Sequence, residues 1–414
     1  MPPIQGFEAA EGILMDMYGG FINQIKKDTP PLWARLKPST DKVEGQQVKF
    51  SAQVENPQGL GSRKTYSSAL PAAVPGKYME LAVGTGRMYG VLEFDAKLLK
   101  AAGGSGKKAF VNYAENEFKG LKTSFLDDLG RQLFGDGSGV ISVCGTTSAS
   151  LTVQLATTAN MEHFIEGMHI DLVVAATGVA IANGSDRTIE SVDVDNLRIV
   201  LDTAGGVVTT DATTGVCRQG SWDAELTGLS AVVSATEDIY GVTTANQRRW
   251  QSYVKTSFGA FNIKGVGKVM AAAKIRSGAY CDIIVCHPDI LAQYWYELTG
   301  TRTFDVSNAP VPVQKLGVGY VALDITIEGK KAVLMSDPNC PHGTIYGLNT
   351  EYLGIQHLGD PEFMNIGGTI LLPNIYGTGG TATFKCVMEY YPELICHRRN
   401  VQWKITGVTD ISGW

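Results

Sequence analysis

The fold of this chain is decided by the segment from Lys107 to Gly139, which reads KKAFVNYAENEFKGLKTSFLDDLGRQLFGDGSG. Its apolar residues recur at steps of three or four, the spacing that places one apolar stripe along a helix. They are Phe110, Ala114, Phe118, Leu121, Phe125, Leu129 and Leu133. The spacing predicts a helix over residues 107–134, roughly 40 Å long at ~1.5 Å rise per residue and buried along one face. The charged residues are expected on its other faces, and they are Glu115, Glu117, Lys119, Lys122, Asp127, Asp128 and Arg131.

The residues that follow the predicted helix, Gly135 to Gly139, read GDGSG. Glycine tolerates positive φ, so the helix is expected to end abruptly there. Beyond this turn, up to about Leu229, short runs of Val, Ile, Thr, Ala and Gly favour β-structure. The strands expected here are Thr152–Ala156, Met168–Ala175 and Ile189–Leu201, the last of them folded at a hairpin turn, Val194–Leu197. Together they suggest a compact barrel inserted after the helix.

Two segments precede the helix. Residues 4–27 carry an apolar pattern interrupted by glycines, which fits either an arm that docks on a neighbouring subunit or an ordinary first helix in the chain's own core. Asp28–Pro75 is rich in proline and contains a strand-like core, QVKFSAQV at Gln47–Val54, and a turn signal, ENPQGLGSRK at Glu55–Lys64. This segment predicts an extended β-hairpin or a long loop.

The C-terminal part alternates between helical and strand-like patterns, which indicates mixed α/β structure. The expected elements are a helix at Ile263–Ile275, a buried strand at Asp282–Val285, a turn at His287–Asp289 that caps a second helix, and strands at Lys331–Ser336 and Ile345–Leu348. The last segment, Thr381–Ile405, is expected to form two strands broken at Pro392, which return to pack along the long helix.

Composition limits the class of protein. A chain of 414 residues can bury a sizeable core in two or three domains, or in one elaborate domain with insertions. A content of 44% hydrophobic and 18% charged residues describes an ordered protein. The net charge of −6 argues against tight wrapping of nucleic acid, because phosphate binding needs clustered Lys and Arg.

The cysteines and the lengths of the apolar runs indicate the cellular compartment of the protein. Seven widely spaced cysteines, an odd number, favour buried reduced thiols. No basic-then-apolar signal segment opens the chain and no run of about 18 apolar residues occurs. We therefore expect a protein that is made and kept in a cytoplasm and has no membrane partner.

The sequence lacks the motifs of catalytic and metal sites. The six histidines are scattered and neither HExxH nor GxSxG occurs. Cys340–His342, with Cys281 and Cys286, does not reproduce paired metal-ligand spacing. The basic cluster His397–Arg399 could touch nucleic acid or an acidic neighbour, or simply end a strand in solvent. We predict no catalytic, cofactor-binding or metal-binding residue, no cofactor and no enzymatic activity.

The stretch AENEFKGLKTSFLDDLGRQLFGDGSG, Ala114–Gly139, resembles the spine helix and exit turn of the major capsid proteins of tailed bacteriophages, whose fold is called the HK-ninety-seven fold. The other predicted elements follow one another in the same order as in this family. The last of them is a mixed segment that begins with CDIIVCHPDILAQYWYEL at Cys281. The resemblance implies an α+β tailed-phage capsid fold with an N-terminal arm, an extended loop, a long spine helix, peripheral and axial domains, and an inserted β-rich domain.

The resemblance also implies a division of the chain. The expected parts are an N-terminal arm at 1–36, the extended loop at 37–78, the peripheral domain with the spine helix at 79–139, the inserted β-barrel-like domain at 140–229, the axial domain at 230–376 and C-terminal peripheral-domain strands at 377–414.

Four basic residues are candidate intersubunit contacts within this resemblance. Lys49, Arg63 and Lys64 lie on the segment that corresponds to the extended loop, which reaches over the adjacent subunit in this family. Arg302 lies in the loop Thr299–Pro312, which would face a capsomer axis. For Lys49, Arg63 and Lys64, an ordinary solvated position on the hairpin is an equally simple interpretation.

The function implied by the resemblance is structural. The chain would assemble into hexamers and pentamers of an icosahedral shell that encloses double-stranded viral DNA by weak non-specific contact. Its partners would be other copies of itself, a separate scaffolding protein, a portal and a decoration protein, and it would be found in the virion after assembly in the host cytoplasm. The alternatives are an encapsulin-like nanocompartment shell and a soluble α/β enzyme.

Overall fold

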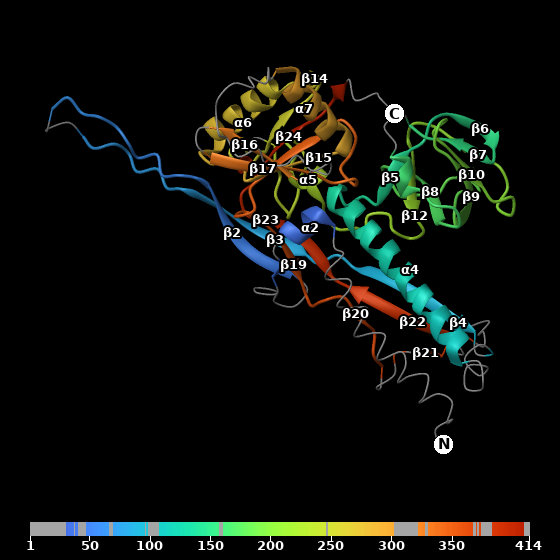
Figure 1. Cartoon of the computed structure of the whole chain (residues 1–414). Helices are drawn as coiled ribbons and strands as arrows, with labels where there is room; N and C mark the ends of the chain where they lie inside the picture. Colours follow the sequence, from blue (N-terminus) through green and yellow to red (C-terminus); the bar gives the residue numbers. More distant parts are fainter. Residues whose placement is uncertain are drawn as a thin grey trace, which may run out of the picture.

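The structure is a computed structural model that describes residues 30–36, 38–39, 47–65, 69–95, 97, 107–156, 160–245, 247–301, 322–327, 330–366, 370, 372–373 and 383–409. The predicted arm at 4–27 and the candidate contact Arg302 lie outside these residues. Figure 1 shows a long helix, α4, that joins two lobes to an elongated sheet, and a hairpin that projects from the body.

The long helix forms as predicted, over Lys107–Phe134. On its apolar stripe, Phe118, Phe125, Leu129 and Leu133 are buried in the main core. The stripe packs on the sheet made by β4 (Met88–Asp95) and β22 (Thr383–Tyr390), with the short strands β20 (Glu362–Phe363) and β21 (Leu372–Pro373) beside it. The helix ends where Gly137 and Gly139 adopt φ of 92° and 75°.

The segment that follows folds into a lobe of its own, at the end of α4 (Figure 1). Its strands are β5 (Val140–Val143), β6 (Thr147–Ser150), β7 (Thr152–Gln154), β8 (His169–Val174), β9 (Arg187–Asp193), β10 (Arg198–Leu201), β11 (Val208–Thr210) and β12 (Thr214–Arg218), with a 3-10 turn, η1 (Met161–His163). The main sheet has the order β5-β12-β8-β9-β10-β7, and the bridge between Cys144 and Leu155 brings its two edges together. The predicted β-structure of this segment and its hairpin turn at 194–197 are confirmed.

A six-stranded mixed sheet organises the other lobe. Its order is β13 (Tyr253–Lys255), β24 (Trp403–Ile405), β18 (Ile345–Leu348), β15 (Ile283–Cys286), β17 (Lys330–Ser336) and β16 (Ala322–Ile327), and α6 (Ile263–Ser277) and α7 (Pro288–Thr301) pack on it. All four residues of β15 are buried, as expected of a central strand. The predicted helices and strands of this region are confirmed.

Smaller elements complete the core. The short helix α2 (Pro31–Arg35) precedes a three-stranded sheet of β1 (Pro38–Ser39), β19 (Leu353–His357) and β23 (Pro392–Cys396). The other short elements are α5 (Leu229–Val232), β14 (Gly259–Ala260), η2 (Arg399–Val401) and β25 (Val408–Thr409). All seven cysteines are buried and unpaired, as predicted. Among the helices described, none is long and apolar enough to cross a membrane.

The C-terminal segment differs from the prediction in two respects. We expected Thr381–Ile405 to form two strands of the sheet along the spine, but β23 pairs with β19 in the three-stranded sheet. Trp403–Ile405 forms a further strand that pairs with β18 and β13 in the other lobe. The 3-10 turn η2 redirects the chain after β23. Trp403 and Ile405 are then buried between α6 and the six-stranded sheet, which gives this short strand a second apolar core to join.

Candidate intersubunit surface

The projecting hairpin consists of β2 (Gln47–Glu55) and β3 (Lys77–Gly84), paired antiparallel from Gln47 opposite Gly84 outward. Figure 1 shows it extending well beyond the body of the molecule. The hairpin was predicted, and its second strand, β3, continues to Gly84.

The root of the hairpin is part of the main core. Val48, Leu81 and Val83 are buried there. Phe50 contacts the rings of His397 and Tyr240, at centroid distances of 4.5 and 6.4 Å. These contacts fix the direction in which the hairpin leaves the body, since a strand held along one face of its root has little freedom to swing.

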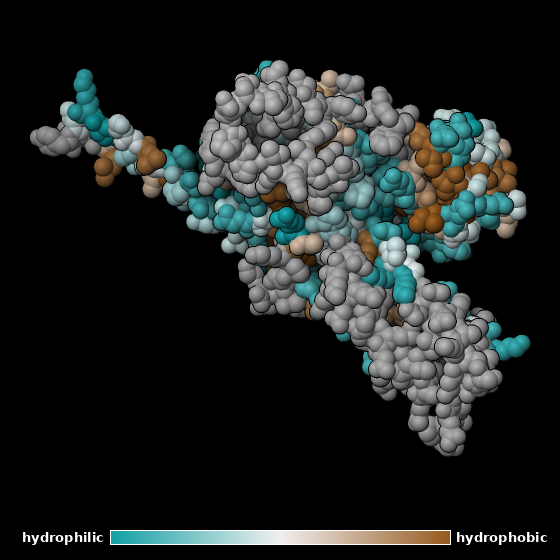
Figure 2. All heavy atoms as spheres, in the orientation of Figure 1, coloured by the Kyte–Doolittle hydropathy of each residue, from teal (hydrophilic) through white to brown (hydrophobic). Residues whose placement is uncertain are grey.

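The tip of the hairpin has the opposite character. Leu60 and Leu70 are 85% and 86% exposed, and Tyr78, on the strand that leads back from the tip, is 66% exposed. Figure 2 shows apolar side chains along the hairpin far from the rest of the chain. The backbone N–H of Gln58 donates to the carbonyl of Val74 at 3.2 Å, so the two arms stay together near the tip. A structured, exposed apolar segment of this kind is typical of a surface that docks on another protein.

The predicted contact residues lie at both ends of the hairpin. Lys49, near the root, forms an exposed cross-strand ion pair with Glu80 at 3.5 Å, which contributes little to stability. Arg63, at the tip, donates to the carbonyls of Ala69 and Ser62, so its guanidinium helps to shape the turn. Lys64 beside it is exposed. Their role as intersubunit contacts stays a prediction.

Part of the charged surface of α4 is buried. Lys122, Asp128 and Arg131 are buried. Arg131 donates to Asp128 at 3.0 Å and to Glu225 at 3.0 Å, and Arg218 donates to Asp128 at 2.7 Å. Burial alone would raise the pKa of Asp128, but Arg131 and Arg218 hold it below its ordinary value. The network ties the inserted lobe to the spine helix.

Within the basic cluster His397–Arg399, His397 is exposed and Arg398 is half-buried, but Arg399 is not a surface residue. Arg399 is fully buried and donates to three carbonyls around the end of α5, those of Ala231, Val232 and Ser234. It also donates to the carbonyl of Glu237 and the hydroxyl of Thr244. Arg398 lies over the ring of Tyr352 at 5.5 Å. The cluster stabilises the subunit internally, so the interpretation as a nucleic-acid contact or a solvated strand end is wrong for Arg399.

A cleft of about 980 Å³ opens between the root of the hairpin, α4 and the segment 218–227. The carboxylate of Glu393 lines this cleft, although the residue is buried. It accepts a hydrogen bond from the backbone N–H of Thr227 at 2.8 Å. Burial raises the pKa of Glu393 from 4.5 to about 7.

This shift predicts a pH-dependent stability. Between pH 4.5 and about 7, Glu393 keeps its proton in the folded chain but has lost it in the unfolded chain. Stability therefore falls as pH rises through that window, by on the order of 3 kcal/mol. In Glu393→Gln the amide cannot ionise, so we expect the urea-unfolding free energy to change less between pH 5 and pH 8. Glu362→Gln, at an exposed position, is the control and should keep the pH dependence of the wild type. If Glu393→Gln also keeps that pH dependence, other titratable groups cause it.

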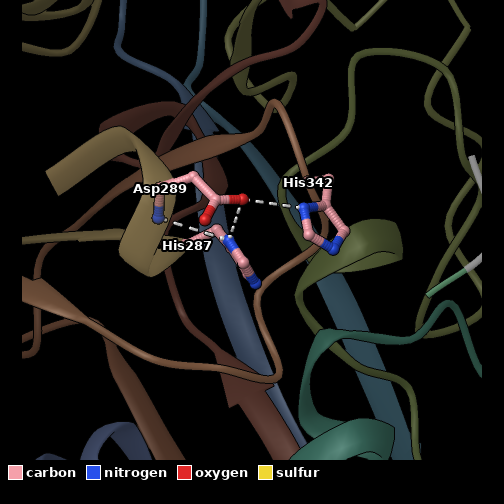
Figure 3. A group of neighbouring side chains, drawn as sticks. All are labelled: His287, Asp289 and His342. Atoms are coloured by element: carbon pink, nitrogen blue, oxygen red, sulfur yellow. Dashed lines mark hydrogen bonds and ion pairs between the residues drawn. The ribbon is translucent and has the colours of Figure 1, made fainter. Parts of the chain in front are cut away.

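The described part of the chain brings together one group of side chains that could ligate a metal, which the sequence did not predict. It consists of His287, Asp289 and His342 (Figure 3). His287 and Asp289 flank the start of α7, whereas His342 lies in the loop between β17 and β18. Sequence spacing connects only the first two, so the group becomes visible only in the folded chain.

Comparisons with known proteins identify the fold. No protein-family model and no curated protein matches this sequence. A chain of the cyanophage A-1(L) capsid asymmetric unit is similar, with a TM-score of 0.52 and 14% identity over 92% of this chain and 93% of that chain. The capsid of an empty GTA particle gives a TM-score of 0.42 with 8% identity, over 92% and 91% of the two chains. A Synechococcus elongatus encapsulin complex gives 0.39 with 9% identity, over 94% and 91%.

The similarity to the cyanophage chain shows that this chain has the tailed-phage capsid fold, which confirms the fold predicted from the spine helix.

Proposed function

We propose that this chain is the major capsid protein of a tailed bacteriophage, a structural subunit that forms hexamers and pentamers of an icosahedral shell around double-stranded DNA. A fold alone does not dictate function. The observation that carries the proposal is the hairpin, whose root is buried in the core while its tip exposes Leu60 and Leu70. The tip buries no apolar surface within the described chain, so its natural partner is another copy of the subunit.

The proposed mechanism is geometric. Each hairpin lies over the neighbouring subunit and buries its apolar tip there, with Arg63 and Lys64 as polar contacts around the tip and Lys49 as a contact nearer the root. Arg302 contacts other copies near a capsomer axis. Contacts that are weak singly become strong when they repeat around closed rings. We also propose the division into arm, extended loop, peripheral, inserted and axial domains given above. The separate apolar core of residues 144–216 supports the inserted domain.

The remaining partners follow from charge and from the proposed role. A net charge of −6 and the internal use of Arg399 favour weak, non-specific contact with packaged DNA. We propose a separate scaffolding protein, a portal and a decoration protein as partners, assembly in the host cytoplasm, residence in the virion and no enzymatic activity. The large inserted lobe favours a viral coat over an encapsulin-like shell.

Negative-stain electron microscopy and sedimentation of the purified chain test the proposal. Shells, tubes or rings of five or six subunits are the expected result, and nuclease-protected DNA inside particles from infected cells distinguishes a viral coat from a shell with protein cargo. Uniform small oligomers, even with a candidate scaffolding protein coexpressed, would contradict the proposal.

A further inference from the structure

The carboxyl ends of two neighbouring parallel strands bring three polar side chains to one edge of the six-stranded sheet. Strand β15 pairs in parallel with β17, so both end at the same edge. His287 follows β15 directly, and Asp289 lies in the first turn of α7. His342 lies in the loop that leaves β17. Two elements that are distant in the sequence therefore supply one cluster.

The three side chains converge on one point. The Nδ1 atoms of His287 and His342 lie 2.8 and 3.0 Å from the same Asp289 oxygen, Oδ2. The two imidazole rings lie side by side, with centroids 4.0 Å apart (Figure 3). The backbone N–H of Asp289 also points at Nδ1 of His287, at 3.4 Å. At 2.8 Å the nitrogen of His287 and the carboxylate oxygen hold either a proton or a metal ion between them, and the second histidine adds a third ligand atom at the same place.

We propose that His287, Asp289 and His342 bind a divalent transition metal ion of the zinc type. Two imidazole nitrogens and one carboxylate oxygen are a donor set that Zn²⁺ uses, whereas Ca²⁺ and Mg²⁺ prefer oxygen ligands alone. Tetrahedral Zn²⁺ separates such ligand atoms by about 3.3 Å, so the observed 2.8 and 3.0 Å need to widen only slightly. The side chain of His342 is 43% exposed, which leaves an open side where water completes the coordination.

The ion would fasten a loop that joins several parts of the subunit. In the loop 337–343, Asp337 accepts a hydrogen bond at 3.4 Å from the N–H of Leu32, which lies in α2. Asn339 lies so close to Gly130 of α4 that a methyl group there would approach its amide nitrogen to 2.4 Å. A metal that holds His342 to the start of α7 therefore links the lobe of the six-stranded sheet to the spine helix. The site stands independently of the proposed capsid role.

Calorimetric titration of the purified, EDTA-treated full-length chain with Zn²⁺ tests this proposal. We expect about one ion per chain and a higher melting temperature with Zn²⁺. His342→Gln should weaken binding at least about tenfold, as even outer contacts of metal sites have effects of that size. Because His342 is partly exposed, this variant should fold even if Asp289→Asn does not.

The matched control is His169→Gln. His169 forms an exposed 2.9 Å pair with Asp186 in the inserted lobe, a histidine and a carboxylate without a second histidine. Its loss should leave Zn²⁺ binding unchanged. Co²⁺ substitution should give a spectrum without thiolate bands, since the buried cysteines are not the ligands. Any one of three results would overturn the proposal: no stoichiometric Zn²⁺ binding, the appearance of thiolate bands, or equal Zn²⁺ affinity in the wild type and in His342→Gln.

Discussion

Arg399→Ala is expected to prevent the subunit from folding. The guanidinium donates to four backbone carbonyls and one hydroxyl in the segment 231–244. Three of these carbonyls lie around the end of α5, where a helix has no partners of its own for its last C=O groups. Each buried acceptor left without a donor costs about 1–3 kcal/mol. The sum is comparable with the whole stability of a typical domain, about 5–15 kcal/mol.

Soluble yield, circular dichroism and urea unfolding measure this effect. Arg399→Lys is expected to fail as well, because one ammonium group cannot reach five acceptors in the fixed geometry of the guanidinium. Arg249→Ala is the control, since Arg249 is exposed. A urea midpoint for Arg399→Ala equal to that of the wild type would show that water replaces the guanidinium in this pocket.

The accuracy of the sequence predictions depends on how local each signal is. The apolar stripe of α4 and the Gly-rich turn after it lie within one segment, and both were predicted correctly. The burial of Asp128 and Arg131 was not predicted, because their partners are distant in the sequence. Arg218 lies 90 positions after Asp128, and Glu225 lies 94 positions after Arg131. A charged residue on a helix is normally solvated, and only its distant partners change this.

The candidate surface and the metal cluster also contain residues with local sequence signals and residues whose partners are distant in the sequence. Prolines, glycines and a short alternating run predicted the hairpin, and these signals are local. Arg399 resembled a surface charge, because nothing in its neighbourhood indicates the carbonyls that it serves. His342 and Asp289 are 53 positions apart, and only the parallel pairing of β15 with β17 brings them together. Polar residues that follow two buried strands were the available signal, but they do not identify the strands as neighbours.

The double variant Leu60→Asp, Leu70→Asp is expected to abolish shell assembly without unfolding the subunit. Both side chains are more than four-fifths exposed, so their replacement removes little from the chain's own core. Burial of one leucine on a neighbour contributes about 1.5–3 kcal/mol. The loss of two such contacts per subunit corresponds to an increase of at least about 100-fold in the concentration needed for assembly, and the repetition of the contact around each ring enlarges the effect. Sedimentation at rising protein concentration, with microscopy of the fractions, measures it.

The control for this variant is Val194→Asp, another exposed apolar residue on a hairpin turn, in the inserted lobe. It adds one negative charge, where the double variant adds two, at a position where no apolar root directs the turn towards a neighbour, so assembly should persist. Equal assembly of the double variant and the wild type would mean that the hairpin tip buries nothing between subunits. A double variant that unfolds at lower urea concentration would instead place the two leucines in the subunit's own core. Assembly lost with the urea midpoint retained is the outcome that only an intersubunit role of the tip produces.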